Sequence, residues 1–259
     1  MPRNTRIHEK EVFVGLFDIL GFSKLVENNE LGKVADMYAA FRNDVVAEGI
    51  SAINSLHKHT KTKDRVRCRA FSDSFLIYTT SSNANCFRSI LGVCDFLFMA
   101  AVQHSLPIRG SITRGPLMAT QGVEIGRSIV EAYKNEQKQE WIGCWISDEC
   151  VSKLDIDEYL ADRSLVKYEV PLKTGEVQKK LAFNWVKSVC WKTMFENRKN
   201  DFTIDQIKEA GTFGTVAASE WDIRRKLDNT RLFVKSLRVV FPAACGVESL
   251  CERVCTQEP

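Results

Sequence analysis

Two aspartates in apolar surroundings are the residues of this chain best suited to do chemistry. Asp18 is the single carboxylate in the apolar run Val12–Ser23, and Asp73 lies between two short apolar runs. A buried carboxylate is unfavourable unless a cation or hydrogen-bond donors compensate its charge. Each aspartate therefore has two interpretations, either as a metal ligand or as a residue that caps or forms a turn.

The elements that must position these carboxylates follow from the pattern of apolar residues. Val12–Ser23 is rich in β-branched and aromatic residues, which predicts a buried strand that ends in a turn at Gly21. Apolar residues then recur every three or four positions between Leu31 and Ile53, which predicts a long amphipathic helix. The runs 66–71 and 74–78 flank Ser72-Asp73 and predict a hairpin with Asp73 at its tip.

The remaining elements give the fold class. The pattern predicts, in order, a helix at Ala84–Gln103, a strand at Ile108–Gly115, a pairing strand at Pro116–Met118, a helix at Gly126–Gln139 and a strand at Trp141–Ser147. This β-α-β-β-α-β order is typical of an α+β, ferredoxin-like domain with a mixed or antiparallel sheet and helices on one face. The first strand and the following hairpin are neighbours in such a sheet, so we expect Asp18 and Asp73 to converge.

The convergence predicts a particular chemistry. Two carboxylates and a backbone carbonyl, such as that of Ile19, are the oxygen ligands that Mg²⁺ or Mn²⁺ prefers when substrate phosphates complete its shell. The turn Ile19–Ser23 leads toward a helix, whose free N–H groups favour phosphate. Together these features predict a two-metal nucleotide site that supports in-line attack at phosphorus.

The C-terminal part has weaker patterns and no linker-like segment. It predicts a hairpin from strands at 167–172 and 180–186, helices at 189–197 and 201–210, and a long charged helix at 217–241. We therefore expect a catalytic domain at 10–160 and, at 161–259, an α/β C-terminal extension packed on it.

Composition excludes several classes of function. The chain of 259 residues has 36 Lys and Arg against 33 Asp and Glu, a net charge of +3 that indicates neither a nucleic-acid nor a membrane surface. Its 9 cysteines include no C-x-x-C pair, and no signal-peptide core or apolar run of membrane-spanning length is evident. We expect a soluble, cytoplasmic protein without nucleic-acid or membrane partners.

Four ordered motifs resemble a known family. They read F-D-I-L-G-F-S, A-F-S-D-S-F-L-I-Y, I-R-G-S-I-T-R-G and G-R-S-I-V-E-A-Y-K, and the similarity around them covers about Val12 to Ser147. In this order they resemble class III nucleotidyl cyclases. More narrowly, F-S-D-S-F, I-R-G-S-I and G-R-S-I-V-E-A-Y-x-x-E resemble the bacterial pyrimidine (uridylate or cytidylate) cyclases of the Pycsar antiphage systems.

The resemblance implies roles for individual residues. Asp18 and Asp73 match the metal-binding aspartates of the family, with the Ile19 carbonyl as a further ligand of two Mn²⁺ or Mg²⁺ ions per site. The implied substrate-binding residues are those of the triphosphate turn and its approach: Phe17, Ile19, Gly21, Phe22 and Ser23. The base-reading position of the family, four residues before the second aspartate, falls on Arg69.

The chain also departs from the family. The purine-reading polar position falls on Val123, and the transition-state Asn and Arg fall on Val130 and Lys134. Lys134 or Arg109, or else Arg114, would then supply the positive charge that offsets the transition state. The alternative for Lys134 is a solvated helix residue, and for Arg109 it is a structural ion pair.

The implied reaction converts a pyrimidine nucleotide. A guanidinium donates hydrogen bonds and never accepts them, so Arg69 suits uracil, with O2 and O4, better than cytosine, which also carries a donor at N4. We therefore expect UTP to be converted to 3′,5′-cyclic UMP and pyrophosphate, with CTP as the alternative substrate. The resemblance further implies a head-to-tail homodimer and a role in antiviral (phage) defence, in which a separate effector protein senses the product.

Two other hypotheses stay open at this point. One is a non-catalytic, cyclase-like domain that binds a nucleotide or only dimerises, which the loss of the Asn and Arg would favour. The other is a diguanylate cyclase or polymerase palm, which shares the sheet and the metals. The hairpin motif of the second class, G-G-[DE]-E-F, is replaced here by F-S-D-S-F at Phe71–Phe75.

Overall fold

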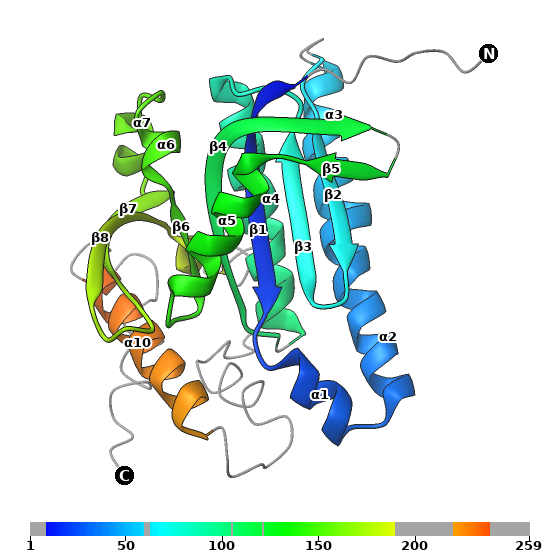
Figure 1. Ribbon diagram of the computed structural model, residues 1–259, viewed down its shortest axis with the longest axis vertical. Helices are drawn as coiled ribbons and strands as arrows, with labels where there is room; N and C mark the ends of the chain where they lie inside the picture. Colours follow the sequence, from blue (N-terminus) through cyan, green and yellow to red (C-terminus); the bar gives the residue numbers. More distant parts are fainter. Residues whose placement is uncertain (1–8, 60–62, 105, 121, 190–219, 239–259) are drawn as a thin grey trace.

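The computed structural model describes residues 9–59, 63–104, 106–120, 122–189 and 220–238 (Figure 1). Its centre is an 8-stranded sheet with the strand order β2-β3-β1-β4-β6-β8-β7, and β5 pairs with β4 outside this path. The strands are β1 (Lys10–Ile19), β2 (Val66–Phe71), β3 (Ser74–Thr79), β4 (Ile108–Thr120), β5 (Val123–Ile125), β6 (Gly143–Ile146), β7 (Leu165–Pro171) and β8 (Val177–Phe183). The helices are α1 (Phe22–Asn28), α2 (Leu31–Arg42), η1 (Asn43–Ile50), α3 (Ser51–His59), α4 (Ala84–Gln103), α5 (Arg127–Lys138), α6 (Asp148–Val151), α7 (Asp157–Ala161) and α10 (Glu220–Arg238).

The first half of the sheet has the expected ferredoxin-like arrangement. The strands that flank the first helices and α4 lie in the order β4-β1-β3-β2, and all three pairings among them are antiparallel. The hairpin β2–β3 and the helix α4 begin and end within a residue of their predicted bounds. The predicted α+β class is therefore confirmed.

Alternate residues of β1 face two different layers. Phe13 and Phe17 join the core under α4, whereas Val12 and Val14 pack with Ala132 of α5. Figure 1 shows α5 and the β4–β5 ribbon in front of the sheet, with α4 behind it. The expectation of helices on one face only is wrong, because α5 covers β1 and β4 from the other side.

Strand β4 runs further than predicted. Pro116–Met118 continues this strand opposite β1, and the strand that pairs with its end is Val123–Ile125. The predicted pairing strand at Pro116–Met118 is therefore wrong. A proline is tolerated there because, among the described strands, only β1 pairs with β4 at Pro116: the pairing with β6 ends at Ile112 and that with β5 begins at Met118.

The predicted amphipathic helix is present but not uniform. Residues 31–59 form consecutive helical segments in which η1 is a π-helix between α2 and α3. Gly49 lies in η1, where a Cβ atom would come within 2.7 Å of the Phe96 side chain, so its lack of a side chain lets η1 approach α4. The recurrence of apolar residues every three or four positions predicted the helix but not its change of pitch.

The C-terminal part shares the sheet and the core of the first part. The predicted hairpin is β7–β8, and β8 joins the sheet by pairing with β6. The ring of Trp185 stacks on Phe98 of α4, and Phe233 of α10 meets Trp141 edge-on. The predicted helices at 189–197 and 201–210 lie almost entirely outside the described residues, and the division at residue 160 stays a prediction.

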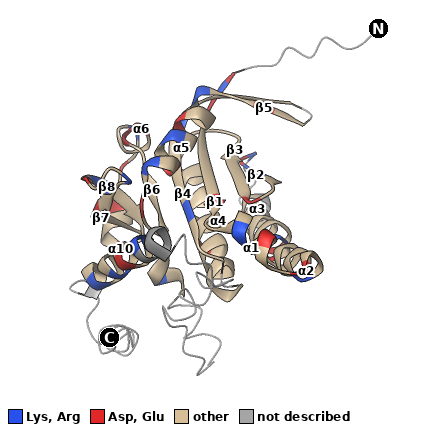
Figure 2. Ribbon diagram, turned by 60° about the horizontal axis from the view of Figure 1, so that its bottom comes forward, with Lys and Arg blue, Asp and Glu red and all other residues tan. Residues whose placement is uncertain are grey.

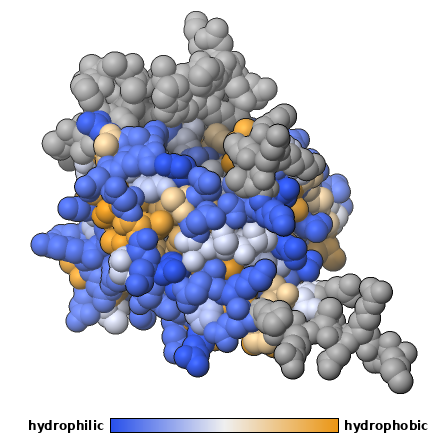
Figure 3. All heavy atoms as spheres, turned by 90° about the horizontal axis from the view of Figure 1, so that it is seen from above, coloured by the Kyte–Doolittle hydropathy of each residue, from blue (hydrophilic) through white to orange (hydrophobic). Residues whose placement is uncertain are grey.

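Among the described residues, one helix has the length and apolar composition of a membrane span. This helix is Ala84–Gln103. However, 67% of its apolar 18-residue stretch is buried inside the protein, as in the core helix of a globular domain. The expectation that no apolar run reaches membrane-spanning length is therefore wrong, if only length and composition are considered. Seen from above, the described surface is mostly hydrophilic with separate apolar patches (Figure 3).

Candidate functional site

The structure brings Asp18 and Asp73 to the same end of the β1–β3 pair. Asp18 lies opposite Ser74 in the strand register, and the Ile19 amide donates to the Asp73 carbonyl oxygen at 3.0 Å. The Ser74 hydroxyl donates to Asp18 Oδ1 at 3.2 Å. Residue Ser72 has a positive φ of 50°, which closes the hairpin so that Asp73 follows directly at its tip. The predicted convergence is thus present in the fold.

The electrostatics around Asp18 favour a bound cation. The pKa of this carboxyl is raised to about 6, chiefly by burial and also by the nearby negative charges of Glu136 and Asp73. The hydrogen bond from Ser74 and the charge of Arg109 oppose this shift in the pKa without cancelling it. A divalent cation shared with Asp73 would relieve both the desolvation and the repulsion.

The donor set fits Mg²⁺ or Mn²⁺ held jointly with a substrate. Among the described residues, no group of three or more His, Cys, Asp and Glu side chains has metal-binding geometry. The protein would then offer two carboxylates and a carbonyl. This set suits a cation that keeps the remaining positions for phosphate oxygens and water.

Glu136 was not predicted as part of this region. It lies on α5, is almost fully buried, and accepts from Arg109 at 2.7 Å (Nε) and 2.5 Å (Nη2). Arg109 Nη1 also donates to the Gln139 carbonyl oxygen at 2.7 Å. The sequence offered two signals for it: Glu136 is the last residue of the motif G-R-S-I-V-E-A-Y-x-x-E, and the four-residue spacing of Ser128, Ala132 and Glu136 places all three on the buried side of α5.

Arg109 lies directly opposite Asp18 in the strand register. Each of its three guanidinium nitrogens already has a partner, either Glu136 or the Gln139 carbonyl oxygen. Its charge is neutralised by Glu136 within a buried pair, which favours the structural interpretation of this residue over the catalytic one. Arg114 lies opposite Phe13, whose side chain faces α4, and it pairs with Glu11 at 3.1 Å. Arg114 is therefore on the other face of the sheet from Asp18.

Lys134 and Val130 lie on the exposed side of α5, one helical turn apart. Lys134 makes no ion pair with any residue that the structure describes. Its side chain is thus available to a ligand or to a second protein molecule, although nothing in a single chain directs it toward Asp18. Val123 is also exposed and lies on β5.

The predicted triphosphate turn has the backbone that the sequence suggests. Gly21 adopts the left-handed conformation, with φ of 78°, which a residue with a side chain rarely adopts, and α1 begins at Phe22. The Leu25 amide donates back to the Gly21 carbonyl oxygen at 3.0 Å. Ser23 is exposed, and the ring of Phe22 packs near Tyr38.

Two of the predicted substrate-binding residues can offer only their backbone. The side chains of Phe17 and Ile19 are fully buried on the α4 side of the sheet. A Cβ atom on Gly110 would come within 2.2 Å of the Phe17 ring, so this glycine makes room for it. The Leu20 amide, next in the turn, already donates to the Pro107 carbonyl oxygen at 2.8 Å.

Arg69 lies on the same face of the sheet as Asp18. It is opposite Leu76, and Leu76 is opposite Leu16, two residues before Asp18. Its Nε donates to Glu124 Oε1 at 2.8 Å. The structure thus places the predicted base-reading residue on the surface that the two aspartates share.

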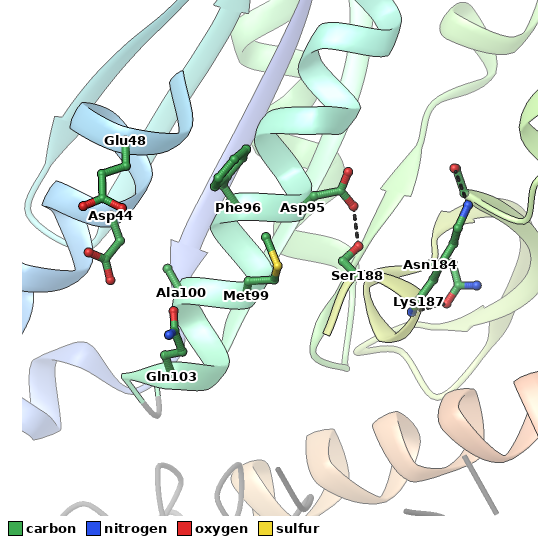
Figure 4. Close-up of a pocket in the computed structure, with 11 residues that line it drawn as sticks. Asp44, Glu48, Asp95, Phe96, Met99, Ala100, Gln103, Asn184, Lys187 and Ser188 are labelled. Carbon is green, nitrogen blue, oxygen red and sulfur yellow. Dashed lines mark hydrogen bonds between the residues drawn. The ribbon is translucent and has the colours of Figure 1, made fainter. Parts of the chain in front are cut away.

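A separate cavity of about 560 Å³ lies on the α4 side of the sheet (Figure 4). It is lined by Asp44, Glu48, Asp95, Phe96, Met99, Ala100, Gln103, Ser164, Asn184, Lys187 and Ser188. The pKa of Asp95 is raised to about 6, chiefly by burial, although a hydrogen bond from Ser188 and the charge of Lys187 oppose the shift. The cavity contains none of the predicted site residues.

Searches among known proteins find likeness only in solved structures. No protein-family model matches the chain, and no curated protein matches it significantly. A bacterial light-regulated adenylyl cyclase is 12% identical with a TM-score of 0.48, over 82% of this chain and 60% of the cyclase. The catalytic core of a rhodopsin-guanylyl cyclase with converted specificity is 17% identical with a TM-score of 0.47, over 69% of this chain and 98% of that core. An adenylate/guanylate cyclase/hydrolase from Silicibacter pomeroyi is 15% identical with a TM-score of 0.44, over 68% of this chain and 95% of that protein.

Proposed function

We propose that this protein is a nucleotidyl cyclase of the class III type, which converts a nucleoside triphosphate to a 3′,5′-cyclic nucleotide and pyrophosphate. The observation that carries the proposal is the meeting of Asp18 and Asp73 beside the Gly21 turn. The raised pKa of Asp18, caused chiefly by burial and then by the charges of Glu136 and Asp73, supports a cation site at this carboxyl. The four ordered sequence motifs support the same assignment.

In the proposed mechanism the protein positions one nucleotide for an intramolecular reaction. Asp18, Asp73 and the Ile19 carbonyl would hold Mn²⁺ or Mg²⁺, which supplies Lewis-acid stabilisation of the phosphate charge when bound. The start of α1 after Gly21 presents backbone N–H groups toward the triphosphate. The ribose 3′-hydroxyl would give its proton to solvent water and its oxygen would bond to the α-phosphorus, while the bond from that phosphorus to the pyrophosphate oxygen breaks.

The identity of the substrate's base is proposed from the hydrogen-bond donors of Arg69. Its side chain is 52% exposed on the face that carries Asp18, where a guanidinium can donate to base carbonyls. UTP is the favoured substrate and CTP the alternative. GTP also presents a carbonyl at O6, so base selectivity must be measured across all four nucleotides.

The proposal includes a homodimer in which the second chain completes the site. Several large apolar side chains are exposed on or beside the face that carries Asp18: Phe71, Val123, Ile125, Val130 and Tyr133. Apolar groups gathered on one side of a fold commonly mark a protein interface. Lys134 lies among them and would then reach a nucleotide held by the partner.

The biological role is proposed from the sequence resemblance alone. The cyclic nucleotide would act in the cytoplasm as a second messenger in antiviral (phage) defence, and a separate effector protein would sense it. Lys, Arg, Asp and Glu are mixed over the described elements (Figure 2), which suits a protein without a nucleic-acid surface.

The test is incubation of the purified protein with each of the four nucleoside triphosphates and Mn²⁺, followed by detection of pyrophosphate and cyclic nucleotide. We expect cyclic UMP and an equal amount of pyrophosphate from UTP, and no product from the Asp73→Asn variant in the same oligomeric state. Absence of a cyclic product from all four nucleotides would remove the enzyme assignment.

A non-catalytic, nucleotide-binding domain is the second candidate. It is favoured by Val130 and Lys134, which stand where the family carries its transition-state Asn and Arg. Binding of nucleotide and Mn²⁺ without formation of product in the same incubation would support this candidate over the enzyme.

A further inference from the structure

Glu124 makes a small polar cluster with Arg69 and Tyr78. Its Oε1 accepts from Arg69 Nε at 2.8 Å and from the Tyr78 hydroxyl at 2.9 Å. The three residues come from β5, β2 and β3, so a single carboxylate oxygen joins three strands. Neither Glu124 nor Tyr78 stands out in the sequence, because the contact depends on how β5 folds over the sheet.

The cluster is built around a buried carboxylate. The Glu124 side chain is only 8% exposed, while the flanking Val123 and Ile125 are both exposed. Glu124 is therefore the inward-facing residue of the short strand β5. Tyr78 is almost fully buried in β3, so the position of its hydroxyl is set by the sheet.

This arrangement orients the Arg69 guanidinium. The Nε–H bond is used within the protein, which leaves the Nη1 and Nη2 donors at the exposed end of the side chain. A guanidinium is planar, so fixing one edge also fixes the plane of the remaining donors. Without Glu124, the long Arg69 side chain would have many rotamers in solvent and would lose entropy on meeting a ligand.

We propose that Glu124 is a positioning residue for base selection, which holds the Nη donors of Arg69 toward the carbonyl groups of the nucleotide base. The inference rests on the proposed function, because it assigns the base to Arg69. Glu124 does not itself touch the reacting atoms. Its removal is therefore expected to change which nucleotide is preferred more than how fast a saturating nucleotide reacts.

A merely structural role would give a different pattern. If Glu124 only ties β5 to the sheet, its loss would lower stability and affect all nucleotides equally. The chain offers a matched control in the Arg88–Glu158 pair, whose arginine is 51% exposed and whose N–O distance is 2.6 Å. That pair joins α4 to α7 and lies away from the proposed site.

The experiment compares kcat and KM for the four nucleotides in wild type and in the Glu124→Ala, Glu124→Gln and Glu158→Ala variants. In Glu124→Ala we expect the UTP preference, as a ratio of kcat/KM values, to fall about tenfold, chiefly through KM. Glu124→Gln keeps an acceptor oxygen without the charge, so its preference should fall by a smaller factor. Glu158→Ala should keep the wild-type preference.

A double variant isolates the coupling. Arg69→Ala combined with Glu124→Ala is expected to show the same nucleotide preference as Arg69→Ala alone, because Glu124 acts through Arg69. Unchanged preference in both Glu124 variants, or an equal loss for all four nucleotides, would overturn the inference. If Glu124→Ala does not fold, Glu124→Gln decides between these outcomes.

A binding measurement separates this inference from the proposed function. 3′-Deoxynucleotides lack the attacking hydroxyl, so their dissociation constants can be measured with Mn²⁺ even if the protein is inactive. Selective binding that is lost in Glu124→Ala would retain the inference without a cyclase. Equal binding of all four 3′-deoxynucleotides by the wild type would overturn it.

Discussion

Asp95 shows at the residue scale what burial does to a carboxyl group in this fold. Its pKa is raised to about 6 chiefly by desolvation, and among the described residues only the Ser188 hydroxyl hydrogen-bonds to it. The folded protein therefore binds this proton more tightly than the unfolded chain does. Its contribution to stability is present at low pH and is lost as the pH rises through about 6.

We predict that Asp95→Asn stabilises the protein at neutral pH. An asparagine still accepts the Ser188 hydrogen bond but carries no charge to desolvate, so the free energy of unfolding should rise by about 2–3 kcal/mol at pH 7.5. The gain should shrink as the pH falls toward 5, as measured by urea unfolding. Exposed Asp36, changed to Asn, serves as the control. A variant as stable as wild type at both pH values would contradict the prediction.

Residues could be predicted from the sequence only where local pattern determines them. Asp18 and Asp73 are recognisable because each interrupts or joins apolar runs. Glu136 ends a family-like motif, but neither it nor Glu124 could be paired from the sequence, since their partners Arg109 and Arg69 lie 27 and 55 residues away and meet them only in the folded chain. Of the two interpretations of Arg109, a catalytic charge or a structural ion pair, the structure shows the ion pair, which is buried with Glu136.

At the element scale, α5 is fixed to the sheet by polar contacts as well as by packing. The Ser111 hydroxyl donates to the Ala132 carbonyl oxygen at 2.9 Å, and the Gln139 side-chain amide (Nε2) donates to the Gly110 carbonyl oxygen at 2.8 Å. Along the chain Glu136 lies between Ala132 and Gln139, and it pairs with Arg109 of β4. Since Glu136 also raises the pKa of Asp18, the position of α5 bears on the candidate site.

We predict that Arg109→Ala weakens the docking of α5. Removing one partner leaves the Glu136 charge buried without compensation, which should lower the free energy of unfolding by about 3–5 kcal/mol. Arg88→Ala, which breaks an exposed pair, should change it by less than about 1 kcal/mol. Urea unfolding monitored by tryptophan fluorescence measures both. An Arg109→Ala variant as stable as Arg88→Ala would show that the pair contributes little.

Most element types could be predicted because their periodicity is local. The error at Pro116–Met118 arose because a proline and the preceding glycine suggest a break, while pairing with β1 carries the strand through both. The π-helix η1 was equally hidden, and so was the close approach of its Gly49 to Phe96, because the two residues lie on segments far apart in the sequence.

At the scale of the whole molecule, the two halves share one sheet and one core. The extension could be predicted to pack on the first part, but its route into the sheet could not. Pairing of β8 with β6 joins residues more than 30 positions apart in the sequence. The aromatic contact of α10 with Trp141 joins residues that are even further apart in the sequence. Such contacts leave no periodic signal in the sequence.

We predict that the proposed dimer depends on the exposed apolar face around β5. Ile125 is 66% exposed, so Ile125→Asp should leave the fold intact while placing a charge where the second chain would pack. Size-exclusion chromatography with light scattering should show that the variant is a monomer. An activity assay should show reduced cyclase activity. Leu31→Asp, at an equally exposed apolar residue on α2, should stay dimeric. A dimeric Ile125→Asp variant would place the interface elsewhere.

The most direct test of the central claim is a count of bound Mn²⁺ ions. In the presence of 3′-deoxy-UTP, which cannot cyclise, we expect the wild type to bind two Mn²⁺ ions for each bound nucleotide, by titration calorimetry or electron paramagnetic resonance. Asp18→Asn and Asp73→Asn should each bind fewer while remaining folded. Equal Mn²⁺ binding by wild type and both variants would contradict the assignment of these two carboxylates to the metal site.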